Sequence, residues 1–159
     1  LGSSIGNFYN KEEIKFLKKL RKSISKNNYL FIGVDLIKNK NTLDKAYNDK
    51  KGYTAKFSLN LINIINRTQK TNLNIKDFYY HGSYNTKLKC IQGFLVSKVN
   101  QNIKIGNKRF FLKKSERILV EISNKFTIQS FKRLASNTGW TTERVWLDNQ
   151  KYYSLFLLK

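Results

Sequence analysis

The apolar run Tyr29–Asp35, with the sequence YLFIGVD, constrains the fold of this chain more than any other feature. An almost unbroken apolar run of this length predicts a strand buried on both faces of a parallel sheet. An amphipathic helix is expected before it, with a capping box at Asn10 and Glu13 and an end near Ser25. Its apolar face would contain Ile14, Leu17, Leu20 and Ile24. A helix followed by a buried strand that ends in an acid is the half-unit of a doubly wound α/β sheet, which binds ligands beyond the carboxyl ends of its strands.

The middle of the chain has a different pattern. Two helices are expected at 42–49 and 57–69, and the apolar side of the second would contain Phe57, Leu61, Ile64 and Ile65. Short strands then follow at 78–84, 90–99, 109–112 and 118–125. This order of elements predicts an α+β insert and not a continuation of the parallel sheet.

The last part returns to the α/β pattern. Thr127 is expected to cap a helix that contains Phe131 and Leu134 and ends at 137–139. Strands at 140–147 and 152–158 would then form a hairpin around Asp148-Asn149-Gln150. A helix and an antiparallel hairpin would therefore close the sheet.

Composition limits the classes of function. The chain has 159 residues, a formal net charge of +21, one cysteine and no methionine. Without a methionine even at position 1, we interpret it as a fragment or truncated product that begins at the end of a strand. The scattered lysines favour a solvated surface over a nucleic-acid interface. No apolar run reaches the roughly 18 residues of a membrane span, and one cysteine fits a reducing cytoplasm, so we expect a cytoplasmic protein.

Four stretches resemble one known family, the histidine-specific, SAM-dependent methyltransferases of ergothioneine biosynthesis and their relatives. They are LGSSIGN (1–7), IGVDLIKNKNTLDKAYNDKKGYTAKFSLNLINIINR (32–67), VEISNKF (120–126) and GWTTERVWLD (139–148). The resemblance implies an α/β fold: the C-terminal half of a Rossmann-like class I methyltransferase sheet with an inserted α+β substrate-binding domain. Residues 1–36 and 128–159 would form the partial methyltransferase domain, and 37–127 the insert.

The resemblance also implies a substrate site for a free amino acid, with L-histidine expected. Asn7 and Tyr47 would hold its carboxylate, and Glu121 and Ser123, two apart on one strand, would hold both ring nitrogens of its imidazole. Gly2 would lie beside the reacting amine, where a side chain would obstruct methyl transfer. No catalytic acid–base group or metal site is expected, because methylation of a neutral amine depends mainly on positioning and on excluding water.

Purely structural explanations exist for some of these residues, and Ser123 taken alone indicates nothing. Asn7 could only cap a turn, and Tyr47 could be an ordinary aromatic on a helix face. Glu121 is harder to dismiss, because an acid between Val120 and Ile122 needs solvent or a partner.

The chain differs from the family in that it lacks two sequence features that bind SAM. The glycine-rich loop and the acid that grip SAM in class I methyltransferases are missing, so the chain alone is expected to be inactive. SAM would serve as methyl donor in the complete protein, or a complementary N-terminal polypeptide would supply the missing half. Gly93 stands where the family often has a larger apolar residue, which affects the shape of the pocket.

Two functions therefore remain open. The first is an α-N-methyltransferase acting on a free amino acid, with no membrane or nucleic-acid partner. The alternative is a non-catalytic remnant or a basic module that binds nucleic acid.

Overall fold

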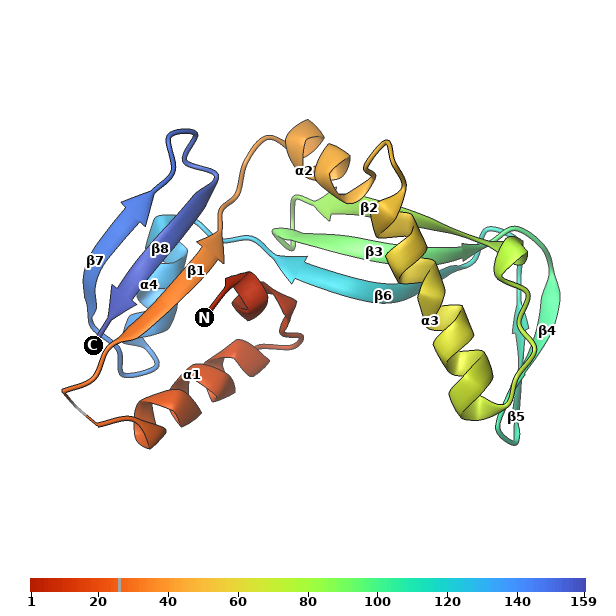
Figure 1. Ribbon diagram of the computed structural model, residues 1–159, viewed down its shortest axis with the longest axis horizontal. Coiled ribbons are helices and arrows are strands. Elements are labelled where there is room, and N and C mark those ends of the chain that lie inside the picture. Colours follow the sequence, from red (N-terminus) through yellow and green to blue (C-terminus); the bar gives the residue numbers. More distant parts are fainter. Residues whose placement is uncertain (26) are drawn as a thin grey trace. The chain divides into compact units, whose positions relative to one another are not determined.

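The computed structural model describes residues 1–25 and 27–159, which divide into two compact units. Unit 1 comprises Leu1–Lys40, Asn85–Cys90 and Ile122–Lys159, and unit 2 comprises Asn41–Tyr84 and Ile91–Glu121. Figure 1 shows the helices and strands of both units. The two units are described separately below.

Unit 1 is a three-stranded antiparallel sheet with helices packed on it. Its strands β1 (Leu30–Asp35), β8 (Tyr153–Leu158) and β7 (Thr142–Leu147) lie side by side in the order β1-β8-β7 (Figure 1). Its helices are the short 3-10 helix η1 (Ser3–Asn7), α1 (Glu12–Ser23) and α4 (Ile128–Ser136). The hairpin expected near the end of the chain is therefore confirmed as β7 and β8.

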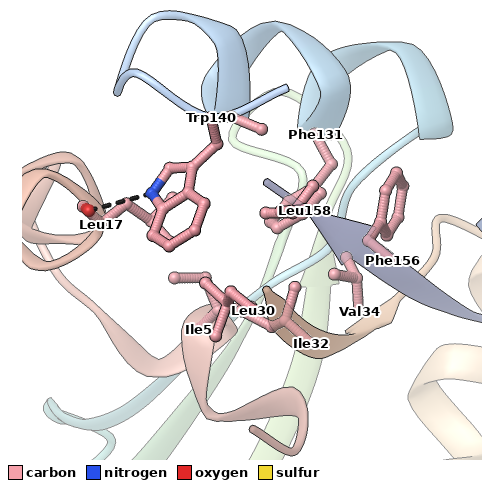
Figure 2. Close-up of a cluster of buried hydrophobic side chains, with 10 residues drawn as sticks. Ile5, Leu17, Leu30, Ile32, Val34, Phe131, Trp140, Phe156 and Leu158 are labelled. Carbon is pink, nitrogen blue, oxygen red and sulfur yellow. Dashed lines mark hydrogen bonds between the residues drawn. The ribbon is translucent and has the colours of Figure 1, made fainter. Parts of the chain in front are cut away.

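One face of this sheet forms the core of unit 1. Because side chains alternate along a strand, Ile32 and Val34 of β1 point to the same side as Phe156 and Leu158 of β8. Figure 2 shows these side chains meeting Leu17 of α1, Phe131 of α4 and Trp140, all at most 2% exposed. The Trp140 indole N–H donates to the buried Leu17 carbonyl at 3.0 Å, which satisfies both polar groups within the core (Figure 2).

The opposite face of the sheet is partly open within this chain. Phe31 is 47% exposed and Trp146 is 36% exposed, and their rings meet edge to face at a centroid distance of 5.6 Å. The expectation that strand 29–35 is buried on both faces of the sheet is therefore wrong for the described residues. The apolar sequence of β1 predicts the strand, whereas the elements that pack on it decide which face is covered.

The free edge of β1 pairs with the first residue of the chain. The Leu1 amino group donates to the Phe31 carbonyl at 2.6 Å, and the Gly33 N–H donates to the Leu1 carbonyl at 2.8 Å. Two bonds that flank one residue in this way have the pattern of a parallel ladder. The pairing around β1 is therefore antiparallel to β8 on one edge and parallel at Leu1 on the other.

The two helix starts in unit 1 differ in how well the sequence predicted them. Thr127 forms the expected cap of α4, since its hydroxyl accepts from the Ser130 N–H at 3.0 Å in a reciprocal capping box. The capping box expected at Asn10 and Glu13 is wrong. Asn10 and Lys11 have φ values of 49° and 64°, and α1 begins only at Glu12, without a side-chain cap.

A single carboxylate organises the turn between β7 and β8. Asp148 Oδ1 accepts from the backbone N–H groups of Tyr152 and Tyr153, each at 2.7 Å, and Oδ2 accepts from that of Gln150 at 3.1 Å. These N–H groups, that of Tyr153 first, hold the pKa of Asp148 below its ordinary value of 3.8. They favour the ionised form of the carboxyl group.

This turn predicts a pH-dependent contribution to stability. Because the folded pKa of Asp148 is depressed, its contribution is present above pH 3.8 and is lost as pH falls through the folded pKa. The thermal midpoint of the wild-type chain should therefore exceed that of Asp148→Ala near neutral pH, and the difference should shrink below pH 3.8. A series of thermal melts across this range measures it. If the difference in thermal midpoint between wild type and Asp148→Ala did not depend on pH, the charge of the Asp148 carboxylate would not contribute to the stability of the turn.

Unit 2 packs a long helix on a small sheet. It contains α2 (Lys40–Tyr47, whose first residue belongs to unit 1), α3 (Tyr53–Gln69) and the 3-10 helix η2 (Ile75–Asp77). Strands β2 (Phe78–Asn85), β3 (Cys90–Ser97) and β6 (Arg117–Asn124) form one sheet in the order β2-β3-β6. The strand ends Asn85, Cys90 and 122–124 are assigned to unit 1. Strands β4 (Gln101–Ile105) and β5 (Lys108–Leu112) form a separate antiparallel pair, of which only β5 was expected.

Helix α3 begins earlier and buries a different face than the sequence predicted. Both oxygens of Asp49 accept from the backbone, from the N–H groups of Tyr53 and Thr54 at 2.9 Å each, so the helix begins at Tyr53. Ile62 is 1% exposed, whereas Phe57 is 82% exposed, so the buried face expected to contain Phe57 is wrong. The core around Ile62 contains Phe78, Tyr80, Leu95 and Leu112. Packing on these residues, and not the apolar pattern alone, fixes the rotation of the helix.

In the described part of the chain, no helix combines the length and the apolar character needed to cross a membrane.

Candidate functional site

Glu121 has a hydrogen-bond partner within unit 2. It lies on β6 and is half-buried, and the Tyr80 hydroxyl of β2 donates to its Oε2 at 3.2 Å. Tyr80 itself is only 8% exposed. The sequence indicated that this acid needs solvent or a partner, and the partner is a tyrosine 41 residues away.

The surroundings of Tyr80 keep its hydroxyl protonated. Burial raises the pKa of this phenol well above its usual value of 10, and the negative charge and hydrogen bond of Glu121 raise it further. Tyr80 therefore acts as a donor towards Glu121 at any physiological pH. A carboxylate has about four acceptor positions, so one bond from Tyr80 leaves Glu121 able to accept from a ligand as well.

Tyr47 is placed close to Tyr80 by the residue that follows it. The Asn48 side chain donates to the Gly82 carbonyl at 2.7 Å and accepts from the Gly82 N–H at 3.0 Å. Its amide group therefore satisfies both backbone groups of Gly82, as the backbone of a neighbouring strand would. Asp44 adds a bond, accepting from the Tyr84 N–H at 2.7 Å. These contacts fix the end of α2, where Tyr47 stands half-buried, against β2.

Two glycines allow this packing in unit 2. A Cβ at Gly82 would lie 2.9 Å from the Tyr80 hydroxyl oxygen and 3.0 Å from the Tyr47 Cβ. A Cβ at Gly93 would lie 2.9 Å from the Glu121 Cβ and 3.0 Å from both Glu121 Oε2 and Tyr80 Cε2. Real Cβ contacts are rarely so short, so the sequence departure at Gly93 leaves the room that the Tyr80–Glu121 pair occupies.

Gly93→Ala should therefore disturb this pair. The added methyl group is expected to displace Glu121 or the Tyr80 ring and to lower the free energy of unfolding by about 1–3 kcal/mol, as overpacking usually does. Urea denaturation of the wild-type and variant chains measures the change. Equal urea midpoints would mean that the neighbouring side chains move aside without cost, which would contradict this account of the packing.

In unit 1, the first motif of the chain packs on the end of β6. A Cβ at Gly6 would lie 2.8 Å from the Asn124 carbonyl and 3.6 Å from the Ser123 Oγ, so only a glycine lets η1 approach so closely. The Asn124 side chain donates to the Phe8 carbonyl at 2.8 Å and holds the end of this segment. Asn7 and Gly2 are exposed on η1 and before it, and a Cβ at Gly2 would meet nothing within 4 Å.

Ser123 is buried beside an ionic network in unit 1. It is 7% exposed, and its hydroxyl oxygen accepts from the Lys125 ammonium at 2.7 Å. The same ammonium lies 2.8 Å from Asp35 Oδ2, and Asp35 Oδ1 lies 2.7 Å from the Lys38 ammonium. Asp35 is the acid that ends β1, so the polar group expected at the carboxyl end of that strand has two cationic partners.

The five residues expected to bind the substrate are thus distributed over both units. Gly2, Asn7 and Ser123 belong to unit 1, and Tyr47 and Glu121 belong to unit 2. Strand β6 carries Glu121 and Ser123 two positions apart, as the sequence predicted. Within each unit the structure adds residues that sequence reasoning missed, namely Gly6, Tyr80 and Lys125.

A cleft of about 550 Å³ is present in unit 1, but none of the five expected residues lines it. Its walls include Ile122 and Asn124, which alternate with Ser123 along β6, and the buried thiol of Cys90. Burial raises the pKa of this thiol. A raised pKa lowers the fraction of the reactive thiolate form, so this thiol is not activated as a nucleophile.

A family described as "Histidine-specific methyltransferase, SAM-dependent" matches residues 1–159. A histidine N-alpha-methyltransferase of Mycolicibacterium smegmatis is 26% identical over 159 residues, which cover 99% of this chain and 50% of the relative. Ergothioneine biosynthesis protein 1 of Schizosaccharomyces pombe is 29% identical over 135 residues, which cover 84% of this chain and 18% of the relative.

Among solved structures, the CcbJ methyltransferase from Streptomyces caelestis resembles this chain with a TM-score of 0.50 at 7% identity, covering 99% of this chain and 57% of that one. At this identity the likeness concerns the fold alone, and it confirms the expected α/β methyltransferase architecture. The chain spans about half the length of the histidine N-alpha-methyltransferases that it matches.

Proposed function

Because the chain belongs to the histidine-specific, SAM-dependent methyltransferase family, we propose that it forms the substrate-holding part of an N-methyltransferase. The acceptor is a free amino acid, L-histidine, and the methyl group goes to its α-amine. Residues 1–36 and 128–159 belong to the methyltransferase domain of a longer protein, and residues 37–127 form its substrate-binding insert.

The observation that carries this proposal is the hydrogen bond from Tyr80 to Glu121. A half-buried carboxyl group that accepts a hydrogen bond from a buried phenol is an acceptor held in a fixed position. A ring N–H of histidine is a suitable donor for it. Ser123, two residues further along β6, then faces the second ring nitrogen.

The amino acid's carboxylate is assigned to Asn7 and Tyr47. An amide and a phenol donate to a carboxylate without forming a full ion pair. Gly2 is assigned to the position beside the amine. A Cβ at Gly2 would meet no atom within 4 Å, so packing within this chain does not require a glycine there. A requirement by the substrate explains this glycine instead. The role of these residues is to orient a neutral amine, because positioning contributes much of the rate in such a transfer.

SAM supplies the methyl group in this family. In class I folds a glycine-rich turn between a strand and a helix holds such a cofactor. Among the described residues, the connections from β1 to α2 (36–39) and from β6 to α4 (125–127) contain no glycine. These two connections do not fit a SAM cradle, and the glycine-containing turn at 2–6 is already assigned to the acceptor, so we assign only the binding of the acceptor to this chain.

The test is methyl transfer by the complete product of the gene that encodes this chain. Purified protein is incubated with methyl-labelled SAM and with L-histidine, L-tryptophan, histamine or imidazolepropionate. Label is expected on L-histidine and not on histamine, which lacks the carboxylate, or on imidazolepropionate, which lacks the amine. Label on tryptophan but not on histidine would overturn the substrate. If no amino acid is labelled and the protein shifts an RNA probe at physiological salt, the basic-module alternative gains support.

A further inference from the structure

The buried ammonium of Lys125 has a defined place in unit 1. The Lys125 side chain is 1% exposed, and its Nζ lies 2.8 Å from Asp35 Oδ2 and 2.7 Å from Ser123 Oγ. An ion buried to this degree is costly unless it is paired and hydrogen-bonded. Asp35 neutralises the charge, so the ammonium can be kept in the core beside Ser123.

The backbone around Lys125 fixes the position of its side chain. Its N–H donates to the Lys89 carbonyl at 2.8 Å, and the next N–H, that of Phe126, donates to the Asp35 carbonyl at 3.1 Å. Leu36 and Phe126 form an isolated parallel bridge beside them. Lys125 and its counter-ion Asp35 are therefore held by neighbouring backbone segments and not by their side chains alone.

The bond from Lys125 determines what Ser123 can do. An ammonium is donor-only, so Ser123 Oγ must accept from it, and the serine O–H is then directed to another acceptor. A hydroxyl that already accepts from a cation is also a stronger donor, since hydrogen bonds in a chain polarise one another. Towards a ligand, Ser123 is therefore biased to donate.

We propose that Lys125 is a positioning residue that makes Ser123 a hydrogen-bond donor to the substrate and thereby selects a neutral imidazole ring. This inference rests on the proposed function. Strand β6 then offers an acceptor at Glu121 and a donor at Ser123, two positions apart. A neutral imidazole has one N–H and one unprotonated nitrogen, which match this pair, whereas an indole or a pyrrole has a donor but no acceptor.

The test is a double-mutant cycle in the complete gene product. Wild type, Lys125→Met, Ser123→Ala and the double variant are assayed with L-histidine and with a pyrrolylalanine, which keeps one ring N–H but has C–H in place of the acceptor nitrogen. Lys125→Met should raise the KM for histidine roughly tenfold, the size expected for one hydrogen bond to a buried group. It should also reduce the preference for histidine over the analogue, and Ser123→Ala should reduce that preference to a similar degree.

The decisive result is non-additivity. In the Ser123→Ala background, Lys125→Met should change the KM for histidine by no more than about twofold, because interacting residues are not additive. Lys38→Met is the matched control, since it removes the other cationic partner of Asp35 but not the bond to Ser123. It should leave the KM for histidine and the preference over the analogue close to those of wild type. Lys125→Arg, which keeps a charged donor, should restore most of that preference.

Several outcomes separate the two proposals. Additive effects of Lys125→Met and Ser123→Ala, or an equal loss of preference in Lys38→Met, would overturn the role of Lys125 while histidine methylation stands. A wild-type protein that does not methylate histidine would overturn both. If Lys125→Met does not fold, adding Asp35→Asn neutralises the carboxylate that has lost this ammonium, and the pair of substitutions, which still removes the donor to Ser123, takes its place in the cycle.

Discussion

Replacing Glu121 by glutamine should lower kcat/KM of the complete gene product for L-histidine about 10- to 150-fold, the range that corresponds to one hydrogen bond to a charged group. The amide keeps the shape of the side chain, and its oxygen can still accept from Tyr80. Its NH₂ group, however, presents donors where the imidazole N–H needs an acceptor. Initial rates at varied histidine concentration, with saturating labelled SAM, measure the loss.

Glu116→Gln is the matched control for this substitution. Glu116 lies in the same unit and is exposed, and its Oε2 accepts from the Lys113 N–H at 2.8 Å. We expect its kcat/KM to stay within about twofold of wild type, because exposed groups away from a site have small effects. An unchanged kcat/KM in Glu121→Gln would exclude a direct role of this carboxylate in binding histidine.

Replacing Phe131 by alanine should lower the free energy of unfolding by about 3–5 kcal/mol, the cost typical of removing a large buried aromatic side chain. Phe131 is 0% exposed, and its ring meets Phe126 at a centroid distance of 5.5 Å and Phe156 at 4.6 Å (Figure 2 shows its place in the core). Truncation leaves a cavity between α4 and the sheet, since these contacts involve both. Urea denaturation of the 159-residue chain, followed by circular dichroism, measures the change.

Phe57→Ala removes the same number of atoms from a side chain that is 82% exposed. It should change the free energy of unfolding by no more than about 0.5 kcal/mol. If Phe131→Ala and Phe57→Ala lowered the free energy of unfolding equally, the burial of Phe131 in the core described above would be wrong. A loss below about 1 kcal/mol in Phe131→Ala would mean that this core is loosely packed.

The candidate site could be predicted from the sequence only in part. The short motifs resemble the family, and this resemblance named Glu121 and Ser123; their spacing of two residues adds only that both point to the same face of a strand. Tyr80 and Lys125 were missed as site residues, since nothing local distinguishes this tyrosine from Tyr79 or this lysine from the other basic residues. Whether the five expected residues bind histidine stays a prediction for the experiments above.

The sequence by itself determined the order and type of most elements, from the strand at Leu30–Asp35 to the closing hairpin, because periodicity and turn residues act over a few positions. Only the tertiary structure decided which side chains meet: Tyr80 and Glu121 are 41 residues apart, and Trp140 and Leu17 are 123 apart. It also decided that Phe57 is exposed and that one face of β1 is partly open. Burial and hydrogen-bond partners depend on long-range packing, which local patterns do not encode.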